Sequence, residues 1–228
     1  MRTAEYAPGR WADMFGEPEQ PTVLLWHGMQ TDARAALRPL ANLLAGHGAT
    51  VVAPDWNSHS VDGGRADLLR SLEFTRAQAG QCAAIVLVGW SLGGVAAAGL
   101  TVDARHHDVQ IAHTVCLAGA FMAPDPITGR AVTERLSSGP GSSPFTLLHG
   151  LADNVVPVSA SREFAAALER VGWPVEIAEL AADHGSIAGA EYDDVADRYV
   201  PGRSARTQRV AAGVAARIAT TFDAGGTA

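Results

Sequence analysis

The chain has 228 residues, of which 47% are hydrophobic and 18% are charged, and its formal net charge at pH 7 is −7. This composition excludes a disordered chain, and the length suits one sizeable core, so we predict a single domain over residues 1–228. Because the 17 Lys and Arg residues are scattered along an acidic chain, nucleic acid and anionic membranes are poor partners.

Residues 1–20 are predicted to be an N-terminal extension. They contain no apolar stretch as long as that of a signal peptide, and no later segment approaches the length of a membrane span. We therefore expect a soluble, cytoplasmic protein.

Short apolar runs alternate with helical patterns along the rest of the chain. The predicted strands are TVLLWHG (22–28), ATVVAPDW (49–56), CAAIVLVGW (82–90), HTVCLAGAF (113–121), SPFTLLHG (143–150) and VEIAEL (175–180), and later helices cover 159–172 and about 204–222. Strands that are apolar throughout are typical of a parallel sheet covered on both faces. We predict a three-layer α/β fold, with helices on both faces of a mostly parallel central sheet.

Two segments need separate treatment. Pro39 lies inside the first helical pattern, so that helix is either kinked or begins there. Residues 122–142 combine three prolines with three glycines and lack a strong periodicity, which predicts a loop or a short lid. Because this connection is short, we expect no large cap domain and an open site.

In an open parallel sheet, ligands bind beyond the carboxyl ends of the strands. One such end is Gly89-Trp90-Ser91-Leu92-Gly93, which fits the G-x-S-x-G pattern of a nucleophile elbow. A serine at a sharp strand-to-helix turn takes an unfavourable backbone conformation, and flanking glycines let the neighbouring backbone pass. Close helix packing would also use these glycines, but it does not explain the serine. We predict that Ser91 is a nucleophile.

A serine nucleophile needs a nearby base that is oriented by an acid. Asp153 and His184 follow the last two predicted strands, and the order Ser, Asp, His is the one expected of a hydrolase with this elbow. His149 lies within an apolar run and is interpreted as a buried structural residue, and His27 as a brace for the loop that follows it. Asp55 remains an alternative acid.

The oxyanion of the reaction requires preorganised N–H donors. We predict the backbone N–H groups of Leu92, at the start of a helix, and of Met29, which follows the flexible Gly28. Large apolar side chains at the same strand ends predict an acyl or aromatic substrate pocket, although each could instead belong to the core: Trp56, Trp90, Phe121 and Met122.

Several carboxylates lie between His184 and the last helix, namely Glu191, Asp193, Asp194 and Asp197. A metal site there is a weak alternative, because the spacing fits no calcium-binding loop and solvated carboxylates need no explanation. We predict that the protein uses no metal and no other cofactor.

Five short stretches together resemble the α/β-hydrolase superfamily over roughly residues 20–222: HG (27–28), PDW (54–56), GWSLGG (89–94), HGLADNVVP (149–157) and DHG (183–185). The closest resemblance is to small single-domain serine esterases of the carboxylesterase and dienelactone-hydrolase-like kinds. It implies an α/β-hydrolase fold, from which this chain is expected to depart by shortened N-terminal strands, since only 21 residues precede TVLLWHG. The chain lacks the HGGG run of hormone-sensitive-lipase-like enzymes, and it has serine where dienelactone hydrolases have cysteine.

The expected function is hydrolysis of small to medium carboxylic esters through an acyl-enzyme intermediate. Ser91 attacks, His184 transfers the proton, and Asp153 orients His184. Alternatives are amide, peptide or thioester hydrolysis on the same triad, or a non-catalytic binding protein of the same fold. The expected partner is a small-molecule ester, and the chain is expected to be a monomer or a homodimer.

Overall fold

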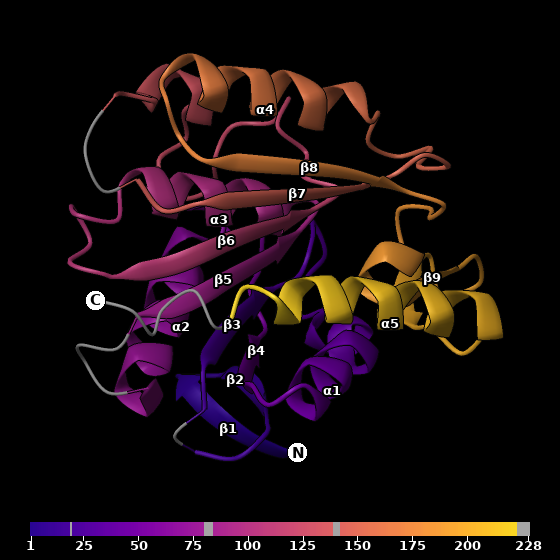
Figure 1. The fold of residues 1–228 in the computed structure, drawn as a ribbon. Helices are drawn as coiled ribbons and strands as arrows, with labels where there is room; N and C mark the ends of the chain where they lie inside the picture. The colour runs from indigo at the N-terminus through magenta and orange to yellow at the C-terminus, as the bar shows by residue number, and fades with distance from the viewer. Residues whose placement is uncertain (19, 80–83, 139–141, 223–228) are drawn as a thin grey trace.

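The computed structural model describes residues 1–18, 20–79, 84–138 and 142–222. Its centre is an eight-stranded sheet with the order β1-β2-β4-β3-β5-β6-β7-β8 (Figure 1). The strands are β1 (Arg2–Ala7), β2 (Arg10–Phe15), β3 (Thr22–Trp26), β4 (Thr50–Pro54), β5 (Ile85–Trp90), β6 (Ile111–Leu117), β7 (Phe145–Gly150) and β8 (Val175–Leu180). All pairs from β4 to β8 are parallel, as the apolar runs predicted.

Helices cover both faces of the sheet. They are α1 (Arg38–Gly46), α2 (Arg65–Ala79), α3 (Leu92–Val102), α4 (Ser159–Arg170) and α5 (Ala205–Ala219). On one face α1 and α5 lie side by side, with Leu40, Leu44 and Val214 in one core cluster (Figure 1). On the other face α2, α3 and α4 supply two further clusters. The three-layer α/β prediction is confirmed.

The N-terminal region differs from the prediction of an extension. Most of residues 1–20 form β1 and β2, an antiparallel pair whose second strand joins the sheet beside β4. A buried charge hides this from an apolar-run search, because Asp13 lies in the middle of β2 with a fully buried side chain. Its carboxylate accepts hydrogen bonds from Arg34 Nε at 3.2 Å and from Arg38 Nε at 2.7 Å.

The structure shows where the helix around Pro39 begins and how large the connection 122–142 is. Helix α1 has Pro39 in its first turn, so the helix begins there and is not kinked, consistent with the missing N–H of proline. In the described part of 122–142 the only helix is η2 (Val132–Arg135), a single 3₁₀ turn. The connection is therefore too small for a cap domain, and its role as a lid stays a prediction.

An unpredicted hairpin follows the last parallel strand. After η3 (Ser186–Ala188), strands β9 (Ala190–Asp193) and β10 (Arg198–Pro201) pair antiparallel, with Ala190 opposite Pro201 and Asp193 opposite Arg198. Strands of four residues around an acidic turn give no apolar run, so the sequence pattern did not reveal them. None of the described helices combines the length and the apolar composition that crossing a bilayer requires.

Close backbone approach at the end of β5 generates a stability prediction. A Cβ atom on Gly89 would lie 2.1 Å from the carbonyl oxygen of Gly93, so Gly89→Ala forces the backbone to move. We expect a loss of about 1–3 kcal/mol in the free energy of unfolding, measured by urea titration. The control is Gly213→Ala in α5, where a Cβ meets no atom within 4 Å. This control should gain about 0.5–1 kcal/mol, and equal stability of the two variants would contradict the packing argument.

Candidate active site

Ser91 occupies the turn between β5 and α3 in a strained conformation. Its backbone angles are φ 56° and ψ −120°, in the left-handed range of φ that non-glycine residues rarely adopt. The turn is fixed to the end of β6, because Ser91 N–H donates to Leu117 O at 2.9 Å and Ala120 N–H donates to Ser91 O at 3.2 Å. The surroundings thus hold the sharp turn that the sequence predicted.

The end of β3 approaches this turn closely. A Cβ atom on Gly28 would lie 3.0 Å from the Cβ of Ser91 and 3.5 Å from its Oγ. The peptide that joins Gly28 to Met29 therefore lies beside the serine. Among the described residues, neither the Met29 N–H nor the Leu92 N–H has a hydrogen-bond acceptor, and Leu92 is the first residue of α3. Both amides are available to a ligand at the positive end of the helix.

His27 fixes the orientation of that peptide. Its Nε2 accepts hydrogen bonds from Ala33 N–H at 3.3 Å and Trp56 N–H at 3.2 Å, so Nδ1 carries the proton and donates to Gly28 O at 2.8 Å. The Gly28 carbonyl and the Met29 N–H belong to one planar trans peptide and point in opposite directions. Holding the carbonyl toward His27 therefore turns the Met29 N–H away from it. This arrangement agrees with the interpretation of His27 as a brace.

The environment of His27 keeps the imidazole neutral. The side chain is fully buried and stacks on Trp56, with ring centroids 5.4 Å apart. Burial lowers the pKa of His27 to about 3, against the opposing hydrogen bond to Gly28. The donor and acceptor roles of its two nitrogens therefore persist across the physiological pH range.

Asp153 and His184 form a buried hydrogen-bonded pair. His184 Nδ1 lies 2.7 Å from Asp153 Oδ2, and their side chains are 4% and 0% exposed. Burial alone would raise the pKa of Asp153, but hydrogen bonds from His149, His184 and the Val156 N–H together hold it well below its ordinary value. An ionised Asp153 accepts a hydrogen bond from the Nδ1–H of His184, which leaves Nε2 unprotonated and able to act as a base.

His149 contacts the same carboxylate, which sequence reasoning missed. Its Nε2 lies 3.5 Å from Asp153 Oδ2 and 2.9 Å from Val156 O, and its Nδ1 lies 2.8 Å from Ser161 Oγ. The residue is buried, as the sequence predicted. The spacing of 149 and 153 across the end of β7 is the only signal that could have revealed the contact.

Asp55, the alternative acid, and Asp183, the neighbour of His184, are both engaged elsewhere. Asp55 is buried and forms an ion pair with Arg34, whose backbone N–H also donates to Asp55 Oδ1 at 3.1 Å. Asp183 Oδ1 accepts the Ser186 N–H at 2.9 Å, at the start of η3. Asp153 is therefore the carboxylate that contacts His184.

The loop of His184 is attached to the residue before the elbow serine. Trp90 Nε1 donates to His184 O at 2.8 Å, and the two rings have centroids 5.3 Å apart. Trp90 is 1% exposed and Trp56 is completely buried, with its Nε1 donating to His27 O at 3.1 Å. The prediction that these tryptophans line the substrate pocket is corrected, because both are core residues whose N–H groups bond within the protein.

The other two pocket candidates are accessible. Met122 is 60% exposed, and Phe121 stacks on Phe164 with centroids 4.0 Å apart. Both line a groove of about 740 Å³ beside α4. Their contact with substrate remains a prediction.

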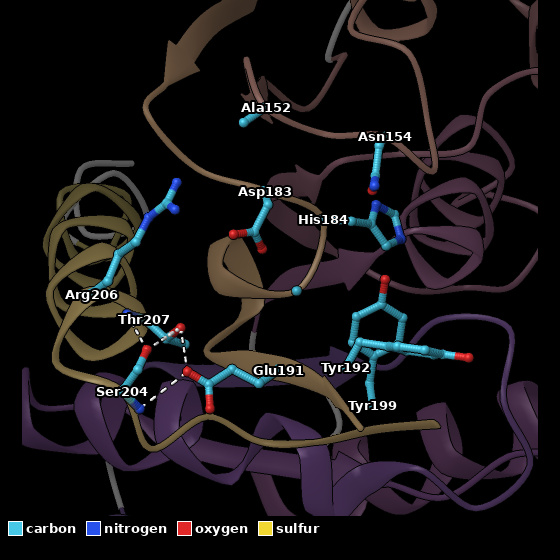
Figure 2. Close-up of a pocket in the computed structure, with 11 residues that line it drawn as sticks. Ala152, Asn154, Asp183, His184, Glu191, Tyr192, Tyr199, Ser204, Arg206 and Thr207 are labelled. Carbon is cyan, nitrogen blue, oxygen red and sulfur yellow. Dashed lines mark hydrogen bonds between the residues drawn. The ribbon is translucent and has the colours of Figure 1, made fainter. Parts of the chain in front are cut away.

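A second, polar cavity of about 500 Å³ includes His184 and reaches the β9–β10 hairpin and α5 (Figure 2). The carboxylate of Glu191 there accepts the N–H groups of Arg203 and Ser204 and the hydroxyl of Thr207, so it fixes the start of α5. Asp193 accepts two N–H groups of the hairpin turn. Within the described ranges no cluster of His, Cys, Asp or Glu suits a metal ion.

The depressed pKa of His27 generates a pH prediction. Unfolded His27 binds a proton near pH 6.5, whereas the folded residue does so only near pH 3. The free energy of unfolding should therefore fall as the pH drops through this window, by at most about 1.4 kcal/mol per pH unit from this residue. His27→Gln removes the contribution and should give a flatter curve. His113, with its pKa lowered to about 4, contributes equally to both proteins. The unfolding free energies of the wild type and His27→Gln are measured by urea titration between pH 4.5 and 6.5. An equal dependence on pH in the two proteins would refute the assignment.

Comparison with known proteins places this geometry in a family. The model of the alpha/beta hydrolase family matches residues 23–225. Thermogutta terrifontis esterase 2 with bound butyrate superposes with a TM-score of 0.71 at 18% identity, covering 100% of this chain and 96% of that one. Its paraoxon-phosphorylated form gives 0.69 at 19% identity, covering 96% and 91% of the two chains. A thioesterase domain from the curacin biosynthetic pathway gives 0.64 at 16% identity, covering 92% and 94%.

None of the curated proteins compared with the chain matches it. The family model nevertheless covers most of the sequence, and the structural similarities extend over the whole fold. The chain therefore belongs to the alpha/beta hydrolase family.

Proposed function

We propose that this protein is a serine hydrolase that cleaves small to medium carboxylic esters through an acyl-enzyme intermediate. The observation that carries the proposal is the hydrogen bond from Trp90 Nε1 to His184 O, because Trp90 directly precedes Ser91. It holds the loop of His184 against the residue that precedes the strained serine, which supports the assignment of Ser91 and His184 to one site. The order Ser, Asp, His along the chain supports the same assignment.

The reaction follows from the positions of these groups. Ser91 Oγ attacks the ester carbonyl carbon while His184 Nε2 takes the hydroxyl proton, and Asp153 stabilises the imidazolium. The Met29 and Leu92 N–H groups stabilise the oxyanion of the tetrahedral intermediate. Its collapse releases the alcohol, which receives the proton from His184. Water, deprotonated by His184, then attacks the acyl-enzyme. The second tetrahedral intermediate collapses to release the acid, and Ser91 Oγ takes the proton back from His184.

The structural neighbours support ester chemistry and keep one alternative in view. The solved structures of esterase 2 hold butyrate or a phosphoryl group from paraoxon, and both are small. Phe121 and Met122 offer apolar surface for an acyl group of similar size. The similarity to a thioesterase domain favours thioesters as the second candidate class. A cytoplasmic location and a monomeric or homodimeric state remain predictions from the sequence.

The identity of the nucleophile can be tested by covalent labelling. A fluorophosphonate probe should label the wild-type protein at one serine, and Ser91→Ala should abolish both labelling and hydrolysis of p-nitrophenyl butyrate. Mass spectrometry of the labelled peptide identifies the residue. Labelling that persists in Ser91→Ala would reject Ser91.

The role of Asp153 can be separated from that of its neighbour Asp183. Asp153→Asn should lower kcat by about 10⁴-fold, because the amide disfavours the required tautomer of His184. The matched control Asp183→Asn keeps an oxygen acceptor for the Ser186 N–H and should retain activity. Equal losses in the two variants would contradict the assignment of Asp153.

The substrate class is tested with matched acyl groups. Butyryl esters, butyryl thioesters and butyryl anilides should be compared by kcat/KM with wild-type protein and Ser91→Ala. We expect the ester to react faster than the anilide, since an amide has a poorer leaving group and a less reactive carbonyl. A higher kcat/KM for the thioester would favour the second class, and turnover of the anilide alone would reject the proposal.

A further inference from the structure

Tyr199 lies on the hairpin that follows the proposed catalytic histidine, and its ring contacts that histidine (Figure 2). We propose that Tyr199 is a positioning residue that, together with Trp90, holds the imidazole of His184 in its working orientation. This inference rests on the proposed function.

Three aromatic rings meet at this point. The centroids of Tyr199 and His184 lie 5.8 Å apart, those of Trp90 and His184 5.3 Å, and those of Trp90 and Tyr199 4.9 Å in an edge-to-face arrangement. A Cβ atom on Gly185 would lie 3.0 Å from Cε1 of Tyr199, so this ring also packs on the backbone after His184. The histidine is thus enclosed by aromatic rings as well as held by Asp153.

The hydrogen bond to Asp153 alone leaves one freedom. It fixes the position of Nδ1 at 2.7 Å from Oδ2, but the imidazole can still pivot about that contact and move Nε2 out of the position that the proposed mechanism requires. Rings packed against the imidazole restrict this pivot. Catalysis is sensitive to such displacements, because a misplacement of about 1 Å can cost about a hundredfold in rate.

The hairpin that carries Tyr199 is firmly attached. Its two strands pair along their whole length, and Gly202 N–H donates to Gly189 O at 2.9 Å just beyond them. Glu191, on the partner strand, accepts backbone N–H groups at the start of α5. The hairpin therefore keeps the ring of Tyr199 in a fixed position beside the imidazole of His184.

The ring, and not the hydroxyl, supplies the restraint. Within the described part of the chain the Tyr199 hydroxyl has no hydrogen-bond partner. Burial and the nearby charges of Asp153 and Asp183 raise the pKa of Tyr199 to about 12, so the hydroxyl stays neutral. Tyr199→Phe therefore keeps the ring that restrains His184. Tyr199→Leu removes the flat ring and leaves a side chain as apolar as that of the Phe variant.

The test compares Tyr199→Leu, Tyr199→Phe and Tyr192→Leu with the wild type. Tyr192 contacts Tyr199 on the same hairpin, with centroids 5.2 Å apart, and serves as the control for damage to the hairpin. On p-nitrophenyl butyrate, Tyr199→Leu should lower kcat by about tenfold to a hundredfold with little change in KM, and should slow fluorophosphonate labelling by the same factor. The other two variants should stay within about twofold of the wild type.

Two outcomes would overturn the proposal: a folded Tyr199→Leu with wild-type kcat, or an equal loss in Tyr192→Leu. A readout that needs no turnover separates it from the proposed function. The Nδ1–H proton of His184 should give an NMR signal in the wild type and in Tyr199→Phe, and should broaden or vanish in Tyr199→Leu. If the wild type hydrolyses no ester and resists labelling, the proposed function fails, and the NMR comparison still decides the role of Tyr199.

Discussion

The strained backbone at Ser91 is the constraint on which the rest of the site depends. A positive φ at a residue with a side chain costs free energy, so it persists only where neighbouring segments enforce it. Here the ends of β3, β5 and β6 and the start of α3 do so, through backbone hydrogen bonds to Ser91 and glycines that admit close approach. The same approach brings the Met29 and Leu92 amides to the serine. The proposed nucleophile and the proposed oxyanion donors therefore depend on the same packed turn.

Asp153 and His27 are both buried in the candidate site, the first as an ionised group and the second as a neutral one. Asp153 stays ionised because two histidines and backbone N–H groups offset its desolvation. His27 stays neutral because burial lowers its pKa and outweighs the opposing hydrogen bond to the Gly28 carbonyl. The partners around Asp153 thus outweigh its desolvation, whereas those around His27 do not.

The sequence was informative where chemistry depends on local patterns. Apolar runs predicted the parallel strands from β3 to β8, and the glycines around Ser91 predicted the sharp turn. The pattern failed where burial depends on partners distant along the chain. Asp13 interrupts the apolar pattern of β2, and its burial depends on Arg34 and Arg38, which lie 21 and 25 residues further along the chain. The short strands β9 and β10 carry little apolar surface. Trp56 and Trp90 at strand ends cannot be assigned to core or pocket without knowing what their N–H groups reach.

Ion pairs join the N-terminal hairpin to the loops that follow β3 and β4. Arg10 of β2 forms ion pairs with Asp32, in the loop after Met29, and with Asp67 of α2, and Arg34 joins Asp13 to Asp55. These ion pairs tie β2 to the loop that follows Met29, whose N–H is a proposed oxyanion donor. Removing β2 would break them, so the first hairpin would act on the proposed site through electrostatics although none of its residues belongs to that site.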